Sequence, residues 1–191
     1  MIELVNVTKS FGGKPVIRNF SAVFHEGATC LMGDSGIGKT TIANIILGLI
    51  QSDSGEVRGT QGRRKSCVFQ ENRLIEELPV LKNLTLVCGK EKTGEALALL
   101  RQMGLEDSVR RPVSSLSGGM KRRVAIARAL IRPADIYIFD EPFKELDDAR
   151  KDAVIGIIRQ VTHNAISVFI THDTGDARSL DARIIHMENG E

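Results

Sequence analysis

The chain has 191 residues, of which 26% are charged and 42% hydrophobic, a composition typical of one globular domain with a sizeable core. A net charge of +2 and an aromatic content of 4% argue against a nucleic-acid partner, because the basic clusters lack the aromatic residues on which bases stack. Cys30, Cys67 and Cys88 lie far apart in apolar stretches, which indicates buried thiols rather than a disulfide framework or a zinc site.

The sequence contains no apolar run near the roughly 20 residues that a membrane-spanning helix needs. Residues 2–5 already have the pattern of a strand, so we also expect no signal peptide. The chain is therefore expected to be cytoplasmic and to work at a membrane only through a partner.

The N-terminal part is predicted to be rich in β-structure. Residues 2–7 alternate apolar and polar side chains, as an exposed strand does, and residues 8–13 have the composition of a turn. A second strand is predicted over residues 16–24 and a buried strand over residues 28–32. Beyond a glycine-rich loop, apolar side chains at helical spacing predict a helix over residues 41–50. These side chains are Ile42, Ile45, Ile46 and Leu49.

The glycine-rich loop has the pattern G-x-x-x-x-G-K-[ST] between a strand and a helix, the context in which this pattern holds phosphates. It reads Gly33-Asp34-Ser35-Gly36-Ile37-Gly38-Lys39-Thr40-Thr41. Backbone N–H groups and a helix N-terminus can hold a triphosphate, and the glycines let it approach the backbone closely. Lys39 adds a positive charge near the β- and γ-phosphates, and Thr40 offers a hydroxyl to Mg²⁺. The loop therefore predicts nucleotide binding.

The middle of the chain changes from short strands to helices. A short strand is predicted over residues 56–58, and a buried strand over residues 66–69 ends at Gln70. Between them, the basic residues 61–65 are interpreted as a solvated turn rather than a phosphate contact. From residue 71 to about residue 131 helical signals dominate, which predicts a helical lobe inserted into an α/β domain. Its apolar stripe is interpreted as core and consists of Ala96, Leu97, Leu100 and Met103.

The last third of the chain returns to alternating strands and helices. The continuous apolar run at residues 136–139 predicts a parallel strand buried on both faces, and it ends in Asp140 and Glu141. A helix is predicted over residues 148–161, and a buried strand over residues 165–170 leads to His172. The final strand is predicted over residues 184–187, closed by a turn at 189–190.

Four candidate groups thus follow strand ends: the phosphate loop, Gln70, the pair Asp140 and Glu141, and His172. Ligands of parallel sheets bind beyond the carboxyl ends of the strands, so we expect these groups to form one site. An acidic residue there suits Mg²⁺, which takes oxygen ligands, and a second carboxylate can orient or deprotonate a water molecule. Taken alone, His172 is equally compatible with a structural histidine.

A further polar, glycine-bearing stretch precedes a long predicted helix. Ser117, Gly118 and Gly119 lie at the start of that helix, where backbone N–H groups and a hydroxyl can bind a second anion. An ordinary helix N-cap explains the same residues, and the stretch alone does not decide between the two.

Together these motifs resemble the ATPase subunit of an ATP-binding cassette (ABC) transporter, over essentially the whole chain and in the family's order. The matched motifs are the Walker A loop at residues 33–41, the Q-loop glutamine at Gln70, the signature at residues 116–120, Walker B at residues 136–140, the catalytic glutamate at Glu141, the D-loop at residues 146–147 and the switch histidine at His172. Phe11 stands where the family places an aromatic residue against adenine. Residues 68–74 and 141–143 are similar to importers of the nitrate, sulfonate and taurine group.

The sequence departs from the family pattern at three points. The D-loop reads Lys144-Glu145-Leu146-Asp147, where Ser-Ala more often precedes Leu-Asp. Phe11 replaces the commoner tyrosine, which keeps the stacking and removes a hydroxyl. The chain is also shorter than most relatives, and we expect no C-terminal regulatory domain.

The resemblance implies a P-loop NTPase fold of the RecA-like type, an α/β core with a β-rich N-terminal part over residues 1–75 and 131–191. A helical subdomain over residues 76–130 is implied within it. It also implies that two chains, identical or different, pair head to tail around two ATP molecules. Each ATP then lies between Lys39 of one chain and Ser117 to Gly119 of the other.

The family's chemistry implies a role for each motif. Thr40, Gln70 and Asp140 hold Mg²⁺, while Lys39, Glu141 and His172 act in hydrolysis. Residues 33–36, 38–41, 117–119 and Phe11 bind the nucleotide. The implied partners are transmembrane permease subunits, reached through residues 71–81, and a substrate-binding protein, with the chain peripheral on the cytoplasmic face of the membrane. The alternatives are a cassette ATPase without a membrane partner, as in DNA repair and translation, and a nucleotide-binding regulatory module without turnover.

Overall fold

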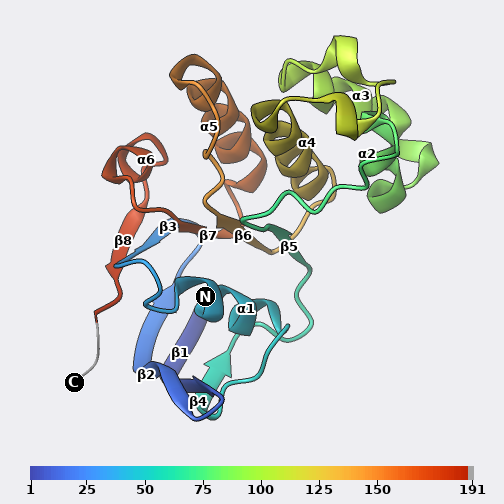
Figure 1. Ribbon diagram of the computed structural model, residues 1–191. Coiled ribbons are helices and arrows are strands. Elements are labelled where there is room, and N and C mark those ends of the chain that lie inside the picture. The colour runs from blue at the N-terminus through green and yellow to red at the C-terminus, as the bar shows by residue number, and fades with distance from the viewer. Residues whose placement is uncertain (189–191) are drawn as a thin grey trace.

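A five-stranded parallel sheet lies at the centre of the molecule, and a computed structural model describes residues 1–188 (Figure 1). In spatial order its strands are β5 (Lys65–Val68), β6 (Ile136–Asp140), β7 (Ile166–Ile170), β3 (Gly27–Met32) and β8 (Arg183–His186). All neighbouring pairs are parallel, so their carboxyl ends meet at one edge. The predicted parallel α/β core is confirmed.

A smaller antiparallel sheet packs below it, with β1 (Ile2–Phe11) between β2 (Lys14–Phe24) and β4 (Ser54–Arg58) (Figure 1). The predicted turn at residues 8–13 is wrong for its first four residues, because β1 continues through them. Thr8 pairs with β4, and residues 9–11 pair with β2. These residues lack alternation because the end of the hairpin is solvent-facing, and only Gly12 and Gly13 form the turn.

Helices cover both faces of the parallel sheet. The helix α1 (Lys39–Leu47) lies on the side of the antiparallel sheet, while α4 (Gly118–Leu130) and α5 (Asp148–Thr162) lie on the opposite side (Figure 1). Strand β6 is buried along its whole length and contributes side chains to the hydrophobic core on each face of the sheet. Ile136 and Ile138 pack toward α1, whereas Tyr137 and Phe139 pack toward α4 and α5. The prediction of a strand buried on both faces is confirmed.

The helix α1 ends earlier than the apolar spacing predicts. Gly48 adopts a left-handed conformation at its C-cap, and the Gly48 N–H donates to the carbonyls of Asn44 and Ile45. Leu49 therefore lies outside the helix and is 58% exposed, so its assignment to the apolar face is wrong.

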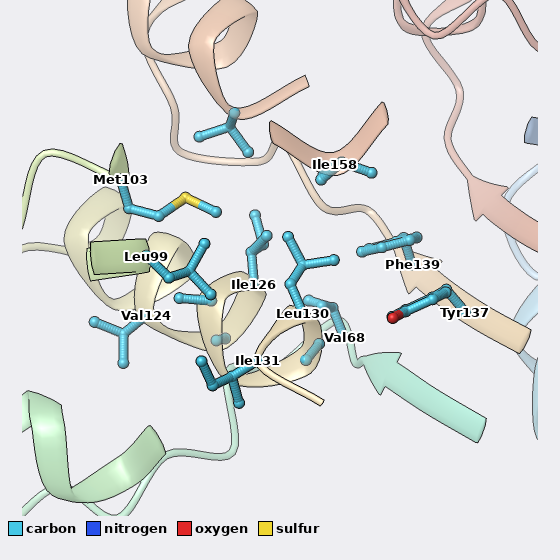
Figure 2. Packing of buried hydrophobic residues seen from close by; sticks show 14 of the residues in the cluster. Val68, Leu99, Met103, Val124, Ile126, Leu130, Ile131, Tyr137, Phe139 and Ile158 are labelled. Carbon is cyan, nitrogen blue, oxygen red and sulfur yellow. The ribbon is translucent and has the colours of Figure 1, made fainter. Parts of the chain in front are cut away.

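The helical segment contains α2 (Val80–Cys88), α3 (Thr93–Gln102) and three 3₁₀ turns, η1 (Lys90–Lys92), η2 (Glu106–Ser108) and η3 (Val113–Ser115). Leu99 of α3 and Met103 just after it pack on α4, whose Leu130 reaches the sheet residue Phe139 in the same cluster (Figure 2). In the predicted stripe only Leu97 is exposed. A subdomain bounded at residues 76 and 130 stays a prediction, because α4 packs in one continuous core with both parts.

The C-terminal elements complete the sheet. The short helix α6 (Thr174–Ser179), which the sequence patterns did not predict, joins β7 to β8. Strand β8 begins and ends one residue earlier than predicted. The turn predicted at 189–190 lies outside the described residues. Among residues 1–188, no helix is both long and apolar enough to cross a membrane.

Candidate functional site

The phosphate loop leaves β3 and enters α1 at the edge where the parallel strands end. A cavity of about 270 Å³ opens beside it. It is lined by Val16, Ser35, Gly36, Gly38, Lys39, Thr40, Thr41, Gln70, Asp140, Glu141 and Ile170. The structure thus brings together the loop, the end of β5 and the end of β6, as the argument from strand ends predicts.

The loop is shaped to leave backbone N–H groups free. Gly38 precedes α1 without any side-chain cap, so the first turn of the helix presents N–H donors that have no partner among residues 1–188. The Lys39 ammonium folds back over the loop and donates to the carbonyls of Gly33 and Asp34 at 2.8 and 2.7 Å. Gly33 has φ 149°, and a Cβ there would lie 2.7 Å from the Met187 carbonyl oxygen, so only glycine fits.

Thr40 and Asp140 form the part of the cavity suited to a metal ion. The Thr40 hydroxyl donates to Asp140 Oδ2 at 2.8 Å, and Asp140 is 5% exposed. Burial raises the pKa of Asp140, and the hydrogen bond from Thr40 opposes that rise. A hydroxyl, a carboxylate and the amide oxygen of Gln70 are hard oxygen donors, which fit Mg²⁺ with water and phosphate oxygens as its remaining ligands.

Glu141 and His172 face each other across the adjoining turns. His172 Nδ1 lies 3.1 Å from Glu141 Oε1, and the His172 side chain is 81% exposed. Glu141 has φ 48°, a left-handed conformation rare for a non-glycine residue, and its N–H donates to the Ile170 carbonyl at 2.9 Å. The pairing of a carboxylate with a histidine suits general base chemistry.

A second cavity of about 420 Å³ shares Gln70 and Glu141 and extends past His172. Six of its lining residues are not among the predicted site residues: Phe143, Lys144, Lys151, Thr171, Asp173 and Asp176. Lys151 on α5 pairs with Asp173 and with the buried Asp176. Thr171 donates to Asp176 Oδ2 at 2.7 Å and so fixes the turn that carries His172. No sequence motif links Lys151 to that turn, because the contact joins two separate elements.

The segment 117–119 lies outside both cavities. Ser117 caps α4 by accepting a hydrogen bond from the Met120 N–H at 3.4 Å, so the N-cap interpretation holds. Glu145 lies against the two glycines: a Cβ on Gly118 would meet its carboxylate, and a Cβ on Gly119 would lie 2.6 Å from its carbonyl oxygen. One chain therefore presents the phosphate loop and this second anion-binding candidate at different places.

Phe11 also lies outside the lining of both cavities. It ends β1, is 50% exposed, and has the Lys9 ammonium 5.4 Å from its ring centroid. An exposed ring face of this kind is available for stacking.

Comparison with known proteins supports one family. The sequence profile described as "ABC transporter" matches residues 17–144. A probable ABC transporter ATP-binding protein, PEB1C of Campylobacter jejuni, is 35% identical and is aligned over 100% of this chain and 88% of its own length. The lipoprotein-releasing system ATP-binding protein LolD of Porphyromonas gingivalis is also 35% identical, with 100% and 97% covered. The aliphatic sulfonates import ATP-binding protein SsuB 1 of Agrobacterium fabrum is 34% identical, with 97% and 70% covered.

Solved structures agree with the sequence relatives. The dimeric structure of the bacterial ABC transporter cassette MJ0796 superposes with a TM-score of 0.88 at 30% identity, covering 98% of this chain and 94% of that one. The same cassette in a post-hydrolysis state bound to ADP and Pi gives a TM-score of 0.86 at the same identity and coverage.

Proposed function

Because the chain belongs to the family of ABC transporter ATP-binding subunits, we propose that it pairs head to tail with a second cassette and closes around two ATP molecules to drive transport. The chain is an ATP hydrolase that uses ATP and Mg²⁺. The dimer, the role of each residue, the membrane partner and the direction of transport are the proposal.

The observation that carries the proposal is the separation of the two anion-binding candidates. Lys39 and the phosphate loop line one cavity, and Ser117 to Gly119 lie outside it at the start of α4. A single chain therefore offers half of a site at each place. Head-to-tail pairing supplies the missing half, and the related cassette MJ0796 is described as dimeric.

Hydrolysis in this site is mainly positioning and charge stabilisation. Lys39 exchanges its loop carbonyls for the β- and γ-phosphates. Thr40, Asp140 and Gln70 hold Mg²⁺, which supplies charge neutralisation on the phosphates. Glu141 takes a proton from water as the water oxygen bonds to the γ-phosphorus and the bond to the β-phosphate oxygen breaks, which releases ADP and phosphate. His172 orients Glu141 and contacts the γ-phosphate.

We assign the membrane partner as a pair of permease subunits served by a substrate-binding protein, with import as the direction. The import proteins among the relatives, such as SsuB 1, support this assignment, although LolD carries a releasing function in its name. The chain then docks on the cytoplasmic face of the membrane through residues 71–81, of which Ile75 is an exposed apolar side chain.

The decisive experiment places a bulky cation at Ser117, in the half-site formed by Ser117 to Gly119. Ser117→Arg is expected to abolish ATP hydrolysis while leaving ATP affinity of the single chain within about twofold, because the phosphate loop is untouched. Ser114→Arg is the matched control, since Ser114 is exposed and lies before the α4 N-terminus. If Ser117→Arg hydrolyses ATP at the wild-type rate, the proposal that two chains share each ATP site is contradicted.

Glu141→Gln tests the closed pair independently. It is expected to bind ATP without turnover and to elute as a dimer in gel filtration with ATP, and as a monomer with ADP. A variant that stays monomeric in ATP and hydrolyses at the normal rate contradicts the role given to Glu141.

A further inference from the structure

One buried cation of α4 takes no part in the roles assigned above. Arg122 lies five residues after the Ser117 N-cap, and it is 2% exposed. Burial lowers the pKa of Arg122, and the nearby carboxylates of Asp140, Glu145 and Glu141 oppose that shift. Within residues 1–188 it forms no ion pair, so its charge is balanced mainly by carbonyl dipoles.

The guanidinium binds three consecutive carbonyls of the turn after β6. Arg122 Nε donates to the Pro142 carbonyl at 3.1 Å, and Nη2 donates to the carbonyls of Asp140 and Glu141, the latter at 2.7 Å. These carbonyls converge because Glu141 is in the left-handed conformation. Such a conformation persists only where the surroundings impose it, and Arg122 is the side chain that gathers its carbonyls.

The third nitrogen of the guanidinium, Nη1, binds the segment that follows β5. Arg122 Nη1 donates to the Phe69 carbonyl at 2.6 Å, the Gln70 carbonyl at 3.3 Å and Asn72 Oδ1 at 3.2 Å. One planar group therefore spans the segment that carries Gln70 and the turn that carries Glu141. A lysine has a single nitrogen and cannot reach both sets of acceptors in this fork geometry.

We propose that Arg122 is a positioning residue that holds Gln70 and Glu141 in register and couples them to the start of α4. Within the proposed head-to-tail dimer, on which this inference rests, Ser117 to Gly119 contact the ATP held by the partner. Gln70 and Glu141 act on the ATP held by this chain. Arg122 is thus the link by which occupation of one ATP site sets the hydrolytic geometry of the other.

The alternative is that Arg122 only stabilises the fold. A buried arginine that satisfies six acceptors is costly to remove, so a loss of stability alone does not discriminate. The two readings differ in the step that they affect. Coupling requires that hydrolysis and its dependence on ATP concentration change while ATP affinity measured without Mg²⁺ does not, because the phosphate loop makes no contact with Arg122 and Gln70 acts on ATP through Mg²⁺.

The experiment compares Arg122→Met and Arg122→Lys with the wild-type chain and with Leu99→Ala. Leu99 is buried on α3, outside both segments, so Leu99→Ala is a control for lost stability. We measure kcat, the Hill coefficient for ATP, the affinity of the single chain for ATP without Mg²⁺, and amide exchange of residues 69–73 and 140–143. All measurements are made below the unfolding transition of each variant.

Arg122→Met is expected to lower kcat about 100-fold, reduce the Hill coefficient to near 1 and raise amide exchange in both segments together, with ATP affinity within twofold. Arg122→Lys is expected to recover part of kcat, and Leu99→Ala to keep the wild-type Hill coefficient. If Arg122→Met retains wild-type kcat and cooperativity, or changes them no more than Leu99→Ala does, the proposal is overturned. If the wild-type chain itself neither hydrolyses ATP nor dimerises, the proposed function fails instead.

Discussion

Gly33 and Gly36, two of the three glycines of the phosphate loop, provide a quantitative test of how the loop is held. Both have positive φ, 149° and 81°, so alanine is strained at either position. Their surroundings differ. A Cβ on Gly33 would lie 2.7 Å from the carbonyl oxygen of Met187, whereas a Cβ on Gly36 would meet nothing within 4 Å.

The costs follow from that difference. At Gly36 the strain of about 1–2 kcal/mol is partly offset by the lower entropy of the unfolded alanine chain, which leaves about 0.5–1 kcal/mol. At Gly33 the strain is about 1–3 kcal/mol, and the backbone of Met187 must also move. The Met187 N–H donates to the Met32 carbonyl at 2.7 Å, and weakening that bond adds about 0.5–1.5 kcal/mol. With the same offset from the unfolded chain as at Gly36, Gly33→Ala should therefore lower the free energy of unfolding by about 1–4 kcal/mol.

Urea unfolding followed by far-UV circular dichroism measures both costs, because the chain has no tryptophan for fluorescence. With a slope of about 2 kcal/mol per molar urea, the midpoints of the two variants should differ by about 1 M. The slope itself should stay at the wild-type value. A Gly36→Ala variant as unstable as Gly33→Ala would refute the reasoning, because the backbone strain common to both positions would then outweigh the clash with the Met187 carbonyl oxygen.

Three further predictions address single side chains. Glu145→Gln, measured in the Glu141→Gln background, should lower severalfold the ATP concentration at which half of the chains are dimeric. The reason is that the Glu145 carboxylate lies against Gly118, where the phosphate of the ATP held by the proposed partner binds. An unchanged ATP titration contradicts this prediction. Burial raises the pKa of Cys30 to about 12, so at pH 8 its thiolate fraction is about 1,000-fold below that of an ordinary thiol. Burial also raises the pKa of Cys67, but Cys67 is only partly buried, so iodoacetamide should label Cys67 before Cys30 by peptide mass analysis. Equal labelling of both thiols would show that Cys30 is accessible and ionised. Phe11→Ala should weaken ATP binding about 10-fold with little change in kcat, since stacking contributes about 1–3 kcal/mol per base. If the ATP affinity is unchanged, adenine does not stack on Phe11.

Local patterns made several features predictable from the sequence. The phosphate loop is contiguous, so its glycines, Lys39 and Thr40 are identified together with the strand and helix that flank them. The burial of β6 on both faces follows from its uninterrupted apolar residues. Boundaries are harder to predict where a turn signal and a strand compete: residues 8–11 extend β1 because Thr8 pairs with β4 and residues 9–11 pair with β2.

The sequence by itself determined which chemical groups are present and that each follows a predicted strand or starts a helix. It also predicted that the groups at strand ends share one edge of the sheet, but only the tertiary structure decided which of them line the same cavity. The order β5-β6-β7-β3-β8 places Gln70 at the end of the strand beside the one that carries Asp140 and Glu141, and these residues line one cavity with Lys39. Periodicity reports which face of a strand is buried but not which strand lies beside it, because backbone hydrogen bonds are the same for any partner. The six acceptors around Arg122 likewise come from two segments that are far apart in the sequence. The sequence patterns therefore did not predict this cluster, because only folding brings the two segments to one guanidinium.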